Sequence, residues 1–165
     1  MRKSLDLGCG KNPKNPSNAE EAYGIDVRDD LEAKILKADL VIEPIPFGDN
    51  TFDFVSAYDF LEHIPRLLYA PNRRYPFVEL MNEIWRVLKP NGEFYSFTPA
   101  FPHAPAFRDP THVNIITKET FTLYFDEKYR YAAMYGFNGA FNINSQAWSG
   151  PHLVTLMTKA LPSSN

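Results

Sequence analysis

A glycine-rich turn directly after a short apolar run is the feature that most constrains the fold. Ser4–Leu7 is predicted as a short strand, and the chain continues with Gly8, Cys9 and Gly10. Two glycines spaced by one residue let the backbone turn sharply and approach a ligand with no Cβ in the way. An ordinary tight turn would show the same pattern. The dinucleotide interpretation needs a third glycine three residues on, where the chain has Pro13, and this argues against NAD or FAD.

Short strands and helices alternate after this turn. We expect strands over Tyr23–Val27, Ile35–Leu40, Phe52–Tyr58 and Glu93–Thr98, helices over Phe77–Leu88 and Thr117–Phe125 (with Thr117 as N-cap and Thr120 at the capping-box position), and a final strand–turn–strand unit over Phe141–Trp148 and His152–Thr158. Residues 11–17 are too rich in proline and asparagine for a full helix. This alternation predicts a layered α/β domain with a mostly parallel sheet.

Acids follow the second and third predicted strands. In sheets of this kind ligands bind outside the carboxyl ends of the strands. Asp26 closes the second strand, where it can accept both hydroxyls of a ribose, although a helix N-cap or a surface turn would also use an acid there. Asp39 and Leu40 end the third strand, and Asp39 is placed to meet an adenine amino group. The first strand ends in the glycine turn and the next two end in acids. Three consecutive strands that each end in a group able to bind a ligand indicate a binding edge of the sheet.

Composition narrows the class of protein. A chain of 165 residues is one domain's worth, and its net charge of −3 argues against a protein that tracks nucleic-acid phosphates. A single cysteine forms no internal disulfide, so we expect a reducing, cytoplasmic setting. No apolar stretch is long enough to span a bilayer, and Asp6, Gly8 and Gly10 interrupt the region where a signal peptide would be apolar.

Five ordered motifs resemble the class I S-adenosylmethionine-dependent methyltransferases, particularly the type 11 branch. They are LDLGCG, GIDVR, ADL, PFGDNTFDFVSAYDFLEHI and EIWRVLKPNGEFYSFTP, and the resemblance runs from Leu5 to about Thr98 with a weaker tail. It implies a single Rossmann-like α/β domain over residues 1–165. The sheet would be mostly parallel and seven-stranded, with a C-terminal antiparallel hairpin and helices on both faces. The motifs are specific for fold and cofactor and almost silent on the substrate.

Two departures from the family pattern concern access to the site. Pro13 and Pro16 shorten the helix that normally joins the first two motifs to a loop. The N-terminal helices that often close over the substrate in this family do not precede the first strand. We therefore expect an open site or one that another subunit covers, as in a homodimer.

The resemblance also implies a cofactor site and a reaction. The cofactor is S-adenosylmethionine, and the residues expected to bind it are Asp6, Gly8, Cys9, Gly10, Asp26, Val27, Asp39, Leu40 and Tyr58. The reaction is in-line displacement at the sulfonium methyl, for which the protein mainly aligns the acceptor. Cys9 between two glycines is expected to fill a tight space and not to act as a nucleophile.

A base is required only if the acceptor must lose a proton. His63, His112 and Asp109 are the candidates, with Tyr58 and Asp59 beside them after the fourth strand. His63 has an alternative role as a helix-start histidine that organises the backbone. The four histidines, at 63, 103, 112 and 152, are not closely spaced along the chain, so we expect no metal site.

The favoured function is S-adenosylmethionine-dependent methyl transfer to a small-molecule or glycan-type acceptor. The alternative is a catalytically silent S-adenosylmethionine-binding subunit that regulates or caps a partner. An RNA substrate is disfavoured by the acidic charge and by the lack of an Asn-Pro-Pro-Tyr-like tetrapeptide after the fourth strand. The segment 99–112, with Phe101 and Phe107 among prolines, is expected to form one wall of the acceptor pocket, or else to be a surface loop tucked onto its own core.

Overall fold

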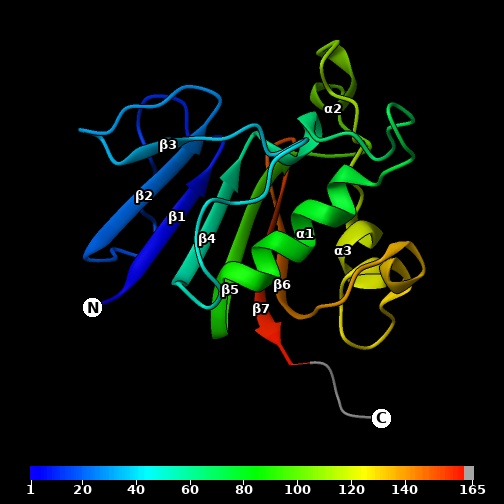
Figure 1. Cartoon of the computed structure of the whole chain (residues 1–165). Helices are drawn as coiled ribbons and strands as arrows, with labels where there is room; N and C mark the ends of the chain where they lie inside the picture. Colours follow the sequence, from blue (N-terminus) through cyan, green and yellow to red (C-terminus); the bar gives the residue numbers. More distant parts are fainter. Residues whose placement is uncertain (162–165) are drawn as a thin grey trace.

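The computed structural model describes residues 1–161, which form one α/β unit around a seven-stranded sheet (Figure 1). The strands are β1 (Lys3–Leu7), β2 (Glu21–Asp26), β3 (Ile35–Lys37), β4 (Phe52–Tyr58), β5 (Leu88–Pro99), β6 (Ala140–Ser149) and β7 (His152–Ala160). The α-helices are α1 (Pro76–Val87), α2 (Pro105–Arg108) and α3 (Lys118–Tyr124), and η1 (Leu61–His63) and η2 (Tyr131–Tyr135) are 3-10 turns.

The strand order is β3-β2-β1-β4-β5-β7-β6. The pairs from β3 to β5 are parallel, and β7 runs antiparallel to both β5 and β6. The predicted mostly parallel sheet with an antiparallel C-terminal end is thereby confirmed. Each parallel strand points its carboxyl end to the same edge, so the residues after β1, β2 and β4 come together there.

Helix α1 forms because its apolar residues recur at helical spacing and Pro76 occupies the first turn, where its missing N–H is not needed. Its buried face carries Leu80, Met81 and Ile84, which join the core beneath the sheet. Each such side chain contributes about 1.5–3 kcal/mol when fully buried. Helix α3 begins at the expected N-cap, where Thr117 and Thr120 form a reciprocal capping box.

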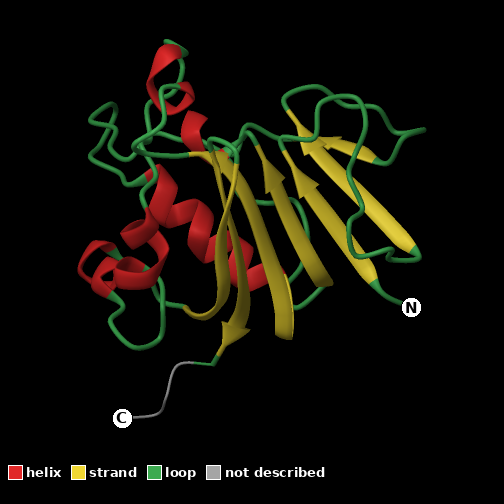
Figure 2. Cartoon of the chain, turned by 180° about the vertical axis from the view of Figure 1, so that it is seen from behind, coloured by secondary structure: helices red, strands yellow, loops and turns green. Residues whose placement is uncertain are grey.

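The helices lie on one face of the sheet, and this departs from the expectation of helices on both faces. Figures 1 and 2 place α1 and α3 on the same side, whereas no helix crosses the opposite face among the described residues. The cause is local: the β1–β2 connection, residues 11–20, is a loop, and the β2–β3 connection is a turn. The 11–20 loop covers β1 and β2, since Asn15 bonds Ser4 and the Lys14 N–H bonds Asp6.

The rest of that face carries a row of half-buried aromatic rings from β4, β5 and β7. The Tyr58 ring lies 5.2 Å from Tyr95 and 5.7 Å from Phe97, and Phe97 stacks on His152 at 4.2 Å. We call this the open face. Among the described residues, no helix combines the length and the apolar character that crossing a lipid bilayer requires.

Candidate functional site

The turn after β1 is held to the end of β2 by the acid predicted to bind ribose. Gly8 and Gly10 both adopt positive φ, +63° and +61°, as a tight turn at this position requires. The Gly10 N–H donates to Asp26 Oδ2 at 3.0 Å, and the Cys9 N–H donates to the Ile25 carbonyl at 3.1 Å. The second oxygen of Asp26 faces Arg28, whose backbone N–H donates to it at 3.3 Å. Asp26 therefore shapes the loop as well as facing its ligand side.

Gly8 is constrained by its neighbours too. A Cβ on Gly8 would lie 2.3 Å from the ring of Phe60, which packs directly on the glycine backbone. Nothing lies within 4 Å of the corresponding position on Gly10. The first glycine is thus required for close packing, and the second only for its backbone conformation.

A hollow of about 300 Å³ opens beside this turn. That volume falls at the lower end of the range of small-molecule and cofactor sites, about 300–1,000 Å³. Five of the predicted cofactor residues border it: Gly8, Asp26, Val27, Asp39 and Leu40. His63, predicted for the acceptor side, borders the same hollow. The strand-end acids and a titratable histidine therefore face one space.

Other predicted cofactor residues lie next to the turn but do not border the hollow. Asp6 is buried and accepts hydrogen bonds from Ser56 Oγ at 2.7 Å and from the Lys14 N–H at 2.8 Å, and burial raises its pKa. Cys9 packs against Gly24, and burial raises the pKa of its thiol to about 11, which leaves it protonated. Tyr58 points to the open face beneath the Lys14 ammonium, 4.0 Å from the ring centroid. These three side chains therefore contact protein groups and do not line the hollow.

Sequence reasoning missed the apolar walls of the hollow, which come from Ile25, Ala38, Val41, Phe60 and Ile64. For Ile25, Ala38 and Phe60 the available signal was their position directly beside Asp26, Asp39 and Asp59. Asp59, one of the candidates after β4, also borders the hollow and has a left-handed φ of +48°. Its Oδ1 lies 2.8 Å from Nε2 of His152. That partner stands 93 positions away in the chain, and no local pattern points to it.

The fold brings the three predicted catalytic residues together. The His63 and His112 rings are 4.8 Å apart and meet edge to face. Asp109 Oδ2 lies 4.0 Å from His112 Nε2. Thr111, which sequence reasoning did not single out, stands between Asp109 and His63.

The hydrogen bonds of Thr111 define the tautomer of neutral His63. The Thr111 hydroxyl donates to Asp109 Oδ1 at 2.7 Å, and these bonds hold the pKa of Asp109 below its usual range. Because the hydroxyl has only this one proton, Thr111 Oγ1 accepts the hydrogen bond from His63 Nδ1 at 3.0 Å. A neutral His63 therefore carries its lone pair on Nε2, where it can take a proton or bind a metal.

Glu62 lies beneath this pair of histidines and is 1% exposed. Its Oε2 accepts from Thr98 Oγ1 at 2.7 Å, and burial raises its pKa. Its backbone carbonyl accepts from Val113 and Asn114, which ties η1 to the segment after β5. This explains how residues distant in sequence reach the same place.

The 99–112 segment reaches the hollow only indirectly, where Thr111 and His112 contact His63. Phe101 and Phe107 are about half exposed, at 53% and 52%, and contact each other edge to face. Among the described residues, none that borders the hollow comes from this segment. Its predicted part in the acceptor pocket stays a prediction.

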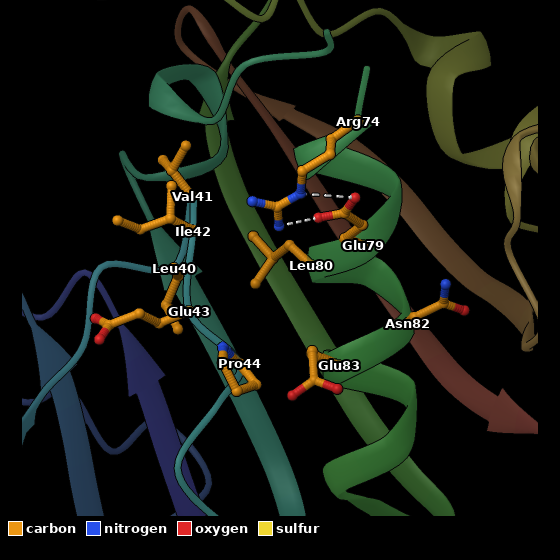
Figure 3. Close-up of a pocket in the computed structure, with 10 residues that line it drawn as sticks. All are labelled: Leu40, Val41, Ile42, Glu43, Pro44, Arg74, Glu79, Leu80, Asn82 and Glu83. Carbon is orange, nitrogen blue, oxygen red and sulfur yellow. Dashed lines mark hydrogen bonds and ion pairs between the residues drawn. The ribbon is translucent and has the colours of Figure 1, made fainter. Parts of the chain in front are cut away.

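A second hollow, of about 320 Å³, lies between the 40–44 segment and α1 (Figure 3). Arg74 pairs with Glu79 at its upper end, and Glu83 extends from α1 toward Pro44. Neither glycine of the β1 turn nor the acids Asp26 and Asp39 border it. Of the two hollows, the one beside the glycine turn is therefore the one that brings the predicted glycine and acids together.

Comparison with protein families decides the identity. The family model described as Methyltransferase domain matches residues 5–96, more than half of the chain. The chain belongs to this methyltransferase family. The match covers β1 through most of β5, which includes every residue predicted to bind the cofactor. It bears out the family resemblance and S-adenosylmethionine as the expected cofactor.

Several solved structures share the fold of this methyltransferase-family chain. A SAM-dependent methyltransferase from Archaeoglobus fulgidus aligns with TM-score 0.59 and 16% identity, over 97% of this chain and 86% of that one. The [4+2]-cyclase SpnF aligns with TM-score 0.64 and 16% identity, over 97% and 75%. A complex between the Trm112 methyltransferase activator and a putative methyltransferase from Haloferax volcanii aligns with TM-score 0.60 and 14% identity, over 95% of this chain and 82% of that one. The comparison with curated proteins finds no match.

Proposed function

We propose that this protein transfers a methyl group from S-adenosylmethionine to a small-molecule or glycan-type acceptor. The observation that carries the proposal is a single hollow bordered by Asp26 and Asp39 from the strand ends and by His63 from the acceptor side. The family match supports the reaction class, and the small-molecule or glycan-type acceptor is proposed from the sequence resemblance.

The residues present fit the cofactor. Asp26 at the end of β2 offers carboxylate oxygens for ribose hydroxyls, and Asp39 after β3 offers one for an amino group. Gly8 brings the backbone to the edge of the hollow with no side chain in the way. When bound there, S-adenosylmethionine supplies a methyl group activated by its sulfonium.

On the acceptor side, His63 is the group that accepts a proton. Its Nε2 lone pair takes the proton that a hydroxyl or amine acceptor loses, which is general base catalysis worth typically 10²–10⁴-fold. Thr111 and Asp109 fix the ring by the hydrogen bonds described above and act as positioning residues. His112 packs against the same ring.

The alternative is a silent cofactor-binding subunit that works with a partner. Two observations keep it open: the SpnF likeness joins this fold to a protein named as a cyclase, and the Haloferax neighbour is a complex with an activator. A homodimer that covers the open site is one form of such an assembly. Sedimentation of the protein with and without S-adenosylmethionine would measure it.

Turnover separates the two functions. The full chain is incubated with S-adenosylmethionine and pools of hydroxyl- and amine-bearing small molecules and glycans, and S-adenosylhomocysteine is measured. We expect His63→Ala to lower turnover at least a hundredfold while calorimetry shows unchanged cofactor affinity, because the base contributes only to the chemical step. Tight cofactor binding with no turnover on any pool would favour the silent subunit.

A further inference from the structure

Three side chains of metal-ligating type meet beside the hollow. Glu62 and His63 come from η1, and His112 comes from the segment after β5. One ligand atom from each lies within 4.8 Å of the other two. The expectation of no metal rested on the spacing of histidines along the chain, whereas the fold places two of them in contact.

Two atoms of this cluster are buried without a hydrogen-bond partner among the described residues. They are Glu62 Oε1 and His112 Nδ1. Buried polar atoms in folded proteins are nearly always satisfied, because leaving one unpaired forfeits its hydration. A carboxylate oxygen and an imidazole nitrogen that are both buried and unpaired, on side chains of the same three-residue cluster, are groups that a bound cation would satisfy together.

The third side chain is already prepared for coordination. His63 donates its Nδ1 proton to Thr111, which passes its own to Asp109, so Nε2 carries the free lone pair. Metal-binding histidines typically donate their other ring N–H to a carboxylate or a neutral acceptor in this way, which fixes the tautomer and the orientation of the ring.

We propose that Glu62, His63 and His112 bind one divalent transition-metal ion of the zinc type. Two imidazoles and one carboxylate form a ligand set that suits zinc, and three protein ligands leave a coordination position open. Zinc bonds of about 2.0–2.1 Å require the three side chains to close around the ion. Because His63 also borders the hollow, the open position lies next to the proposed cofactor site.

The proposed metal site does not depend on methyl transfer. A role for the ion in holding the oxygen of the methyl acceptor, however, rests on the proposed function. The lone pair of His63 serves either the ion or a proton, so a metal-loaded site would take over the task assigned above to the free histidine.

The test is zinc binding to the metal-free full chain, measured by calorimetry. We expect one Zn²⁺ per chain with a dissociation constant of micromolar or lower. His112→Ala and His63→Ala should each weaken it at least tenfold. His103→Ala is the matched control, since this histidine contacts Trp148 outside the cluster, and it should leave zinc affinity unchanged. Cys9→Ser should also leave it unchanged, which excludes a thiolate site.

The proposal is overturned if the wild-type chain shows no saturable zinc binding. Equal affinity in wild type and His112→Ala, or loss of zinc in Cys9→Ser, also overturns it. Circular dichroism and S-adenosylmethionine affinity are recorded on the same samples. Cofactor binding without zinc binding would contradict the metal site alone. Zinc binding without cofactor binding would contradict only the proposed function.

Discussion

At the scale of single residues, Asp26 has two tasks, since its carboxylate holds the Gly10 N–H and borders the ligand hollow. We expect Asp26→Ala to weaken S-adenosylmethionine binding tenfold or more, because a charge-assisted hydrogen bond contributes about 1.5–3 kcal/mol. Calorimetry measures the change. Asp29→Ala is the control, an exposed acid three residues on that does not border the hollow. Equal affinities for the two variants would remove Asp26 from the site.

Glu62 belongs to the same scale and predicts a pH dependence. Burial raises its folded pKa, so above the ordinary value of about 4.3 the folded chain binds more protons than the unfolded one. Stability of the metal-free protein therefore falls as pH rises from that value through the raised pKa. Glu62→Gln should remove this part of the slope in denaturant unfolding at several pH values. Parallel curves for the two proteins would show that Glu62 titrates normally.

At the scale of elements, the β1 turn offers a matched pair of glycines. Gly10→Ala should cost about 1–2 kcal/mol of unfolding free energy, the penalty of a left-handed backbone with a Cβ. Gly8→Ala should cost clearly more and also weaken cofactor binding, because its Cβ meets Phe60 at 2.3 Å. Urea unfolding of both variants measures the difference. Equal costs would mean that the Phe60 ring moves aside freely.

The 99–112 segment is the second element with a testable part. Replacing Phe101 and Phe107 together by Ala should reduce acceptor turnover and leave cofactor affinity within about threefold, because neither ring borders the cofactor hollow. Kinetics and calorimetry on the same preparation check this. Untouched turnover, or a collapse of cofactor affinity, would show that the segment is not an acceptor wall.

At the scale of the whole molecule, one core cluster joins the sheet to α1 and to the aromatic residues around α3. We therefore expect a single cooperative unfolding transition. Trp85 on α1 and Trp148 on β6 report on different parts of the chain. Their combined fluorescence and far-UV circular dichroism should give coincident denaturation curves. Two separated transitions would contradict a single domain over residues 1–165.

Much of this architecture could be predicted because it is encoded locally. The glycine turn, the strand-end acids and the apolar face of α1 each lie within a few consecutive residues. The contact of His63 with His112 and of Asp59 with His152 could not, because both depend on how distant segments cross above the sheet edge. Pro13 and Pro16 predict the loop that replaces a helix between β1 and β2, whereas the short turn between β2 and β3, which also leaves the second face without a helix, has no such local signal.

The strand order has a further consequence for how the chain reaches its native state. β1 precedes the other six strands in the chain but lies inside the sheet, where Leu7 pairs with Ala57 of β4. β7 follows the other six and inserts between β5 and β6, so that Glu93 meets Thr158. Pairings between such distant segments raise the contact order, which slows folding. A ribosome-bound chain from which β7 has not yet emerged would expose the β5 edge, and an exposed strand edge of this kind promotes aggregation until β7 pairs with it.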